Sequence, residues 1–181
     1  VPPDPIRMYA DADEIRCQVT AFADAGANMI RVVGGLAYEQ EEFWQACADA
    51  GVLVWQDAML ATFDPPAEHG ELICRELTTV LRAASGNPAL VVVSGGSETL
   101  QQPEMLGLGP AESAMAVIDS LLPAAVAEHC DAHYVRSSPA PPPGSADLAI
   151  RPDTGVAHWF GVGGYLRPIT DVRCAGVTFA A

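Results

Sequence analysis

The chain has 181 residues, half of them hydrophobic and 18% charged, so it can bury a core, and disorder of the whole chain is excluded. Its 23 acidic residues outnumber nine basic ones, all of which are arginine, and the formal charge is −14. This balance repels phosphate backbones and anionic lipid surfaces, so we expect neither nucleic acid nor a membrane as a partner.

Predicted helices and strands alternate along the first half of the chain. Asp11 is placed to cap the first helix, in which Ile15, Val19, Phe22 and Ala23 form an apolar stripe at helical spacing. In order, the pattern predicts a helix over 11–25, a strand over 28–33, a helix over 39–50, a strand over 52–56, a helix over 71–84 and a strand over 89–93.

The second half continues this alternation less regularly. A helix is predicted over 111–129 and a short strand over 133–135. The proline-rich stretch 137–146 is predicted to be a loop, because prolines lack a backbone donor and fix φ. Further strands are predicted at 156–159 and 177–180.

Alternating strands and helices with short connections predict parallel pairing and an α/β layer architecture. Two versions remain open at this point, a doubly wound open sheet and an eight-stranded barrel. In both, functional groups gather at the carboxyl ends of the strands. Polar and aromatic residues follow several predicted strands, so the sequence predicts a site at that end of the sheet.

The five cysteines (Cys17, Cys47, Cys74, Cys130 and Cys174) have unrelated spacings and an odd number. A disulfide framework favours an even number in a shorter secreted chain, so we expect buried reduced thiols and a cytoplasmic protein. The one metal-like cluster, at residues 129–133, contains two histidines, a cysteine and an aspartate but lacks a second ligand pair. We therefore expect no metal and no cofactor.

Glu98 is the strongest candidate for chemistry. It follows a predicted strand after two glycines, and a carboxyl group desolvated at a strand end can act as an acid near neutral pH. The alternative is that Glu98 only caps the next helix. Asp57 follows another strand and is a candidate for binding hydroxyl groups, with a role in the loop alone as its alternative.

Other side chains at the strand ends are candidates for binding. Arg31 ends an apolar strand and needs an acidic partner there, in a site or in a structural ion pair. Trp55 and Trp159 can stack on a ligand or belong to the core. Ser97 lies in a strand-to-helix turn resembling a nucleophile elbow, so a serine hydrolase with His158 as base is an alternative, although the last glycine of that motif is replaced by threonine.

Several segments, in order along nearly the whole chain, resemble the catalytic barrel of glycoside hydrolase family 2, specifically its β-mannosidase branch. Segment 26–35 is similar to that branch's motif Gly-x-Asn-x-x-Arg-Val-Trp-Gly-Gly, and segment 51–57 to Gly-x-Leu-Val-Trp-Gln-Asp. The match continues through 87–90, through the strand that leads to Glu98, through 134–139 and through His158-Trp159.

This resemblance implies a retaining glycosidase on a (β/α)8 barrel, with a carbohydrate as substrate and no cofactor. It implies that Glu98 is the general acid/base, that Asp57 binds a sugar hydroxyl and that Arg31 orients the nucleophile. The same resemblance makes Trp55, Ser97, His158 and Trp159 substrate-binding residues. Ser97 stands where the family has an asparagine that contacts the sugar 2-hydroxyl, so substrate choice and activity are both in question.

The family's nucleophile would follow residues 177–181, immediately after the end of the chain. The resemblance places the barrel's first and last strands outside residues 1–181 as well. We therefore expect a catalytic-barrel fragment of a larger multidomain protein, inactive by itself, whose open sheet edges a second copy of the chain could cover. A catalytically degenerate module that binds carbohydrate, or is only structural, is the alternative to an enzyme.

Overall fold

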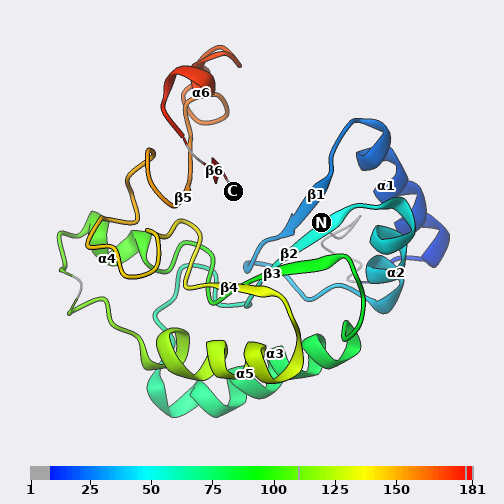
Figure 1. The fold of residues 1–181 in the computed structure, drawn as a ribbon, viewed down its shortest axis with the longest axis horizontal. Helices are drawn as coiled ribbons and strands as arrows, with labels where there is room; N and C mark the ends of the chain where they lie inside the picture. Colours follow the sequence, from blue (N-terminus) through cyan, green and yellow to red (C-terminus); the bar gives the residue numbers. More distant parts are fainter. Residues whose placement is uncertain (1–8, 110, 178, 181) are drawn as a thin grey trace.

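A four-stranded parallel sheet forms the centre of the computed structural model, which describes residues 9–109, 111–177 and 179–180 (Figure 1). Neighbouring strands follow chain order, and Arg31 lies opposite Trp55 while Asp57 lies opposite Ser94. The strands are β1 (Met29–Val32), β2 (Leu53–Asp57), β3 (Leu90–Ser94) and β4 (His133–Val135).

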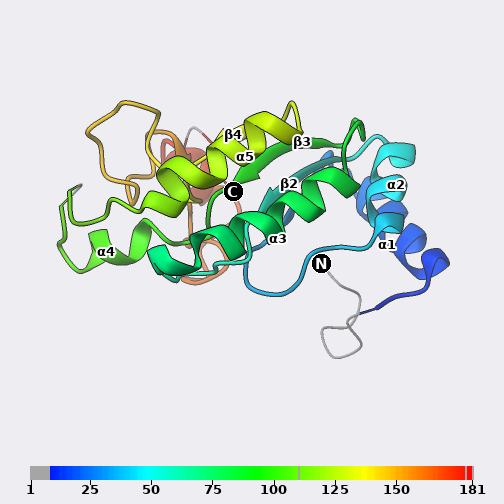
Figure 2. The same ribbon diagram turned by 90° about the horizontal axis from the view of Figure 1, so that it is seen from below.

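The longer helices pack against one face of this sheet. Figure 2 shows α3 and α5 lying across the strands on that face. Their apolar stripes meet the sheet in a single core, in which Leu77, Leu81, Val93, Ile118 and Leu122 are fully buried. The longer helices are α1 (Ala12–Asp24), α2 (Glu41–Ala50), α3 (Gly70–Ala83) and α5 (Leu122–His129), and the short turns are η1 (Ala67–His69), α4 (Gln101–Met105), η2 (Val117–Leu121) and α6 (Asp171–Cys174).

Local sequence signals explain where the first two helices begin and end. The Asp11 carboxylate accepts the Asp13 backbone N–H at 2.8 Å, which confirms the predicted N-cap of α1. Gly51 ends α2 in the left-handed region with φ 67°, where glycine has no Cβ to clash. Within α1, Ile15 and Val19 are buried as predicted, but Phe22 is 43% exposed. Phe22 therefore lies at the rim of the apolar stripe, outside the core.

A doubly wound sheet reverses its strand order and carries helices on both faces. Here the order β1-β2-β3-β4 runs without reversal, and the helices that build the core share one face. The predicted mixed α/β architecture with parallel strands is therefore confirmed, and the unreversed strand order differs from that of a doubly wound sheet. Within the described ranges the sheet is open at β1 and β4.

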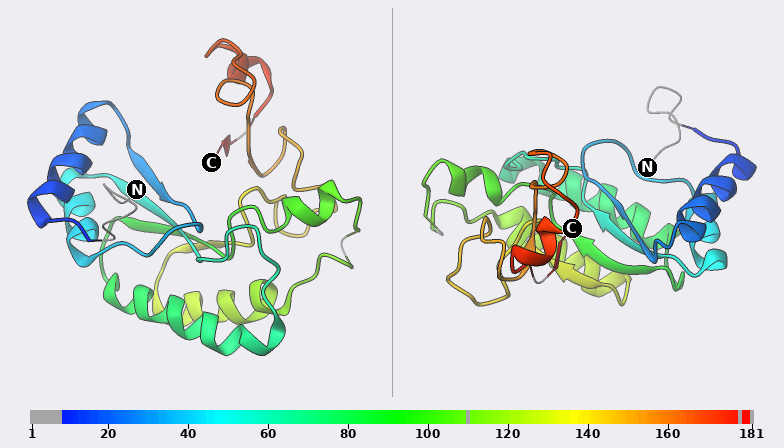
Figure 3. Two further views of the ribbon diagram at one scale, coloured as in Figure 1. Left: turned by 180° about the vertical axis from the view of Figure 1, so that it is seen from behind. Right: turned by 90° about the horizontal axis from the view of Figure 1, so that it is seen from above.

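The strands β5 (Val156–Ala157) and β6 (Phe179–Ala180) lie within the ranges predicted at 156–159 and 177–180, but outside the four-stranded sheet in which the barrel resemblance would place them. These two strands pair with each other in parallel, separately from the four-stranded sheet. Between β4 and β5 runs the predicted proline-rich loop, which cannot supply a continuous row of backbone donors. Figure 3 (left) shows the C-terminal part of the chain, coloured orange to red, on the side of the sheet opposite α3 and α5.

Two further expectations need correction. The predicted helix over 111–129 is regular only in its second half, where the π-helical turn η2 leads into α5. All five cysteines are free, as expected, but Cys47 alone among them is buried, while Cys17 and Cys174 are exposed. Cys17 is two residues from each of the buried Ile15 and Val19. In an α-helix this spacing places a side chain on the opposite side, so Cys17 lies on the outer side of α1.

Gly95 is required where the chain leaves β3. A Cβ at this position would overlap the Tyr134 hydroxyl and lie 2.7 Å from the Arg136 carbonyl oxygen. We expect Gly95→Ala to lower the free energy of unfolding by about 1–3 kcal/mol, the usual cost of forcing extra atoms into a packed site. Urea denaturation of the two proteins measures this difference.

Gly35→Ala is the matched control. Gly35 is exposed, and a Cβ there would meet no atom within 4 Å. Its substitution should change the free energy of unfolding by less than about 1 kcal/mol. Equal losses in the two variants would contradict the close approach at Gly95.

Candidate active site

The structure brings most of the predicted site residues into one connected group. Arg31 comes from β1, and Trp55 and Asp57 from β2. Ser97 and Glu98 follow β3, and His158 follows β5. The carboxyl ends of parallel strands meet at one edge of a sheet, which places the first five side chains together, and the C-terminal segment adds His158 from above.

A buried ion pair lies at the centre of this group. Arg31 Nη2 donates to Asp57 Oδ2 at 2.8 Å, and the Asp57 side chain is fully buried. Trp55 Nε1 donates to Asp57 Oδ1 at 2.9 Å, and the Gly34 backbone N–H donates to Oδ2 at 3.2 Å. A buried carboxylate with this many donors is held rigidly in place.

The remaining donors of Arg31 reach the candidate catalytic residues. Arg31 Nη2 also donates to Ser97 Oγ at 3.1 Å, and Nη1 lies 3.2 Å from His158 Nε2. The guanidinium carbon is 5.9 Å from the centre of the Trp55 ring, within the range of a cation–π contact. Arg31 therefore links β1, β2, the end of β3 and the C-terminal segment.

Glu98 contacts this network through His158. His158 Nδ1 lies 3.1 Å from Glu98 Oε1, and the Glu98 side chain is 27% exposed. The backbone of Glu98 meets α4 through its carbonyl oxygen, which accepts the Gln101 N–H at 3.1 Å. The Glu98 side chain is thus engaged with His158, whereas the N-cap of α4 is Leu100 and has no side-chain cap hydrogen bond, so the structure does not support the helix-capping alternative.

Ser138 belongs to the group, although the sequence did not single it out. Its Oγ lies 3.0 Å from His158 Nε2, and the residue is fully buried. The available signal was its place shortly after β4, at the same end of the sheet as the other candidates.

The serine hydrolase alternative depends on a contact between Ser97 and His158. His158 Nε2 instead meets Ser138 and the guanidinium of Arg31. Ser97 Oγ accepts from Arg31, and its hydrogen bonds in the described residues include none to an imidazole. A cation beside Nε2 also opposes proton uptake there, so the geometry gives this alternative no support.

The two candidate tryptophans, Trp55 and Trp159, already contact other residues of the chain. Trp55 is buried and stacks on Phe179 of β6, with ring centres 5.7 Å apart and planes 20° apart. Trp159 Nε1 donates to Asp171 of α6 at 3.1 Å, which directs this indole toward the C-terminal segment. That both tryptophans bind substrate remains a prediction, as does the role of Asp57 toward a sugar hydroxyl.

Burial and neighbouring charges shift the pKa values of two groups in the site, Asp57 and His158. Burial raises the pKa of the Asp57 carboxyl above its ordinary value, while Arg31, Trp55 and Gly34 oppose that rise. Burial also lowers the pKa of His158, and the Arg31 cation lowers it further, although Glu98 and Asp57 act in the opposite direction. His158 is accordingly a neutral imidazole at neutral pH.

The lowered pKa of His158 predicts a loss of stability in acid. The unfolded chain takes up this proton near pH 6.5, whereas the folded chain takes it up only at lower pH. The folded state therefore loses stability as the pH falls below about 6.5 toward the folded-state pKa, and the contribution is intact above that range. Urea unfolding at pH 7.5 and pH 5.5 should show a smaller difference in His158→Asn than in the unchanged protein.

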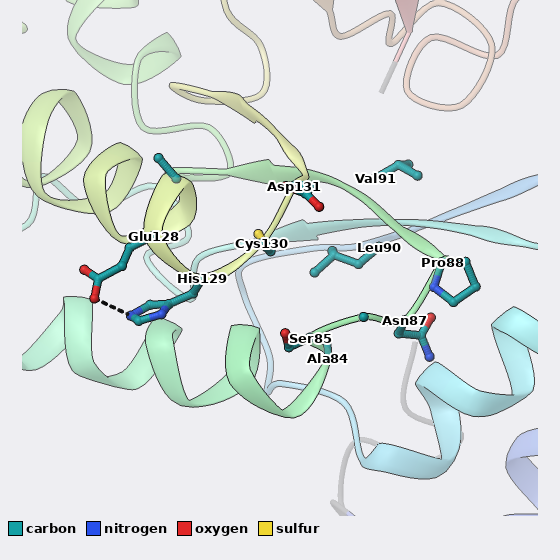
Figure 4. A pocket seen from close by; sticks show the side chains of 12 residues that line it. Ala84, Ser85, Asn87, Pro88, Leu90, Val91, Glu128, His129, Cys130 and Asp131 are labelled. Atoms are coloured by element: carbon teal, nitrogen blue, oxygen red, sulfur yellow. Dashed lines mark ion pairs between the residues drawn. The ribbon is translucent and has the colours of Figure 1, made fainter.

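A hollow lies at the other end of the strands, away from the candidate site. It has a volume of about 510 Å³ and is lined by the loop between α3 and β3, the start of β3, the end of α5 and the two residues after α5 (Figure 4). His129, Cys130 and Asp131 of the metal-like cluster lie on its wall, and His129 Nε2 is 3.9 Å from Glu128 Oε1. No group of three or more side chains suited to a metal ion occurs in the part of the chain that the structure describes.

The described residues also include no helix long and apolar enough to cross a membrane.

Comparison with known proteins relates the chain to glycosidases. No family model matches it. It is 34% identical to a β-mannosidase of Mus musculus over 100 residues, which are 54% of this chain and 11% of the mouse protein. It is 32% identical to a β-mannosidase B of Emericella nidulans over 177 residues, which are 90% of this chain and 21% of the fungal protein.

Solved structures show the same fold. A β-D-mannosidase from Dictyoglomus thermophilum matches with a TM-score of 0.79 at 21% identity, over 95% of this chain and 21% of that one. A β-glucuronidase of Bacteroides uniformis matches with a TM-score of 0.56 at 18% identity, over 68% of this chain and 15% of that one. The chain thus spans between 11% and 21% of the length of these relatives and neighbours.

Proposed function

The chain carries a β-mannosidase-like segment of glycoside hydrolase family 2, and from this premise we propose that the whole protein is a retaining β-mannosidase in which Glu98 is the general acid/base. Such an enzyme works by double displacement. Glu98 would protonate the departing glycosidic oxygen while a second carboxylate attacks the anomeric carbon, and would then take a proton from the water that releases the sugar.

The observation that carries this proposal is the position of Glu98 at the end of β3, beside the buried Arg31–Asp57 pair. Glu98 is partly exposed, whereas both Asp57 oxygens are already occupied by Arg31, Trp55 and Gly34. Glu98 is therefore the carboxylate of this group that is free to meet a substrate. The attacking carboxylate of the mechanism would follow β6, outside the described residues.

We also propose that the sheet forms part of a (β/α)8 barrel. The unreversed order of four parallel strands, with the core helices on one face, is what a segment of such a barrel requires. The barrel interior would then be the face that carries Arg31, Trp55 and Asp57. A carbohydrate is the proposed partner, while a cytoplasmic location, a larger multidomain protein and an oligomer that covers the sheet edges remain predictions.

The test is hydrolysis by the whole protein of aryl β-mannosides, followed by ¹H NMR. We expect turnover, and we expect the sugar first released to have the β configuration, because two displacements restore the starting stereochemistry. A first product with the α configuration, or hydrolysis of β-glucuronides in preference to β-mannosides, would overturn the proposal.

One departure from the family pattern, at Ser97, favours a second candidate function, a module that binds mannosides without hydrolysing them. Ser97 replaces the asparagine that the family resemblance expects, and its Oγ accepts from Arg31. Losing one preorganised donor toward the sugar costs about 10²–10³ in rate. Binding of mannose by calorimetry without any release of product would support this candidate.

A further inference from the structure

His158 stands between the buried ion pair and the proposed acid/base. Its Nε2 lies 3.2 Å from Arg31 Nη1 and 3.0 Å from Ser138 Oγ, and its Nδ1 lies 3.1 Å from Glu98 Oε1. The imidazole side chain is only 9% exposed. Both ring nitrogens are therefore engaged by protein groups.

These contacts determine which nitrogen carries the proton. A guanidinium has donors and no acceptor, so Nε2 beside Arg31 must present its lone pair. The ring is neutral at neutral pH, and its hydrogen then resides on Nδ1, where the Glu98 carboxylate is the acceptor. Ser138 Oγ, 3.0 Å from the same nitrogen, can share this single lone pair as the second donor of a bifurcated hydrogen bond.

We infer that Arg31 and Ser138 hold His158 as the neutral Nδ1–H tautomer, and that this imidazole is a positioning residue for Glu98. This rests on the proposed function. The N–H at Nδ1 directs Glu98 Oε1 toward the interior of the site and leaves Oε2 for the glycosidic oxygen. Asp57 fixes Arg31, Arg31 fixes His158, and His158 fixes Glu98, so the buried ion pair acts on the reaction through a chain of hydrogen bonds.

Two substitutions at His158 separate this role from simple packing. In His158→Asn, the side-chain amide can take the place of Nδ1 and still donate to Glu98. In His158→Gln, the amide reaches the place of Nε2, and the donor to Glu98 is lost. The whole protein is assayed on an alkyl β-mannoside, whose leaving oxygen needs a proton, and on 2,4-dinitrophenyl β-mannoside, whose leaving group departs without one.

We expect His158→Gln to lower kcat on the alkyl mannoside by about 10- to 100-fold, part of the 10²–10⁴-fold that general acid catalysis contributes. On the dinitrophenyl mannoside the first displacement should be reduced less than about threefold. His158→Asn, which keeps a donor for Glu98 but loses the Nε2 contacts, should recover part of this loss on the alkyl mannoside relative to His158→Gln. Equal losses on the two substrates, or equal losses in the two variants, would overturn the positioning role.

The tautomer is tested independently of activity. A long-range ¹H–¹⁵N spectrum of the unchanged protein distinguishes an imidazole protonated at Nδ1 from one protonated at Nε2, and His158→Asn identifies the signal. We expect the Nδ1–H form; the Nε2–H form would overturn the inference even in an active enzyme. Absence of any turnover together with the Nδ1–H signal would instead refute the proposed function and leave the tautomer in place.

Discussion

Glu98→Gln should lower kcat for an alkyl β-mannoside by about 10²–10⁴-fold in the whole protein. Glutamine has the shape of glutamate, and its Oε1 can still accept from His158 Nδ1, so the group around the site should persist. The substitution removes the proton that the departing oxygen needs. Initial rates on alkyl and dinitrophenyl mannosides measure the effect, and the loss should be much smaller for the first displacement of the dinitrophenyl substrate.

A small anion provides the second part of this experiment. The first displacement of the dinitrophenyl substrate leaves a glycosyl-enzyme, and azide can attack this intermediate without a general base. Azide should therefore restore turnover in Glu98→Gln, with β-mannosyl azide as the product. Glu68→Gln, an exposed position in η1, is the control and should leave the rates unchanged. Unaltered hydrolysis of alkyl mannosides by Glu98→Gln would remove Glu98 from the mechanism.

Arg31→Met should be the most destabilising change in the site, lowering the free energy of unfolding by about 3–5 kcal/mol. It leaves the fully buried Asp57 carboxylate without its cation. Methionine retains much of the apolar volume, so the loss reports the unpaired charge. Urea denaturation measures this loss. The double variant Arg31→Met with Asp57→Asn should recover part of the lost stability, because the buried charge is then absent.

Arg151→Met is the matched control for the ion pair. Arg151 pairs with Asp147 and Asp153 at the surface, where its side chain is 48% exposed. Exposed pairs contribute about 0–1 kcal/mol, so this variant should unfold almost as the unchanged protein does. A loss at Arg151 as large as the loss at Arg31 would contradict the importance of burial.

The sequence was most informative where structure depends on neighbouring residues. The strands β1 to β4, the helices α1 to α3 and the cap at Asp11 follow from apolar spacing and from polar or glycine residues at the ends of elements. The same local order, with short connections, implies parallel strands whose carboxyl ends share an edge. That rule alone brought Arg31, Asp57 and Glu98 into one predicted site.

Only the tertiary structure decided how these residues are used. His158 meets Glu98 across 60 residues and Arg31 across 127, and no spacing along the chain encodes which of its nitrogens faces which partner. The full burial of Asp57, the participation of Ser138 and the separate pairing of β5 with β6 arise in the same way. Apolar periodicity specifies which face of an element is buried, whereas the contacts of a polar group depend on elements that meet only when the chain has folded.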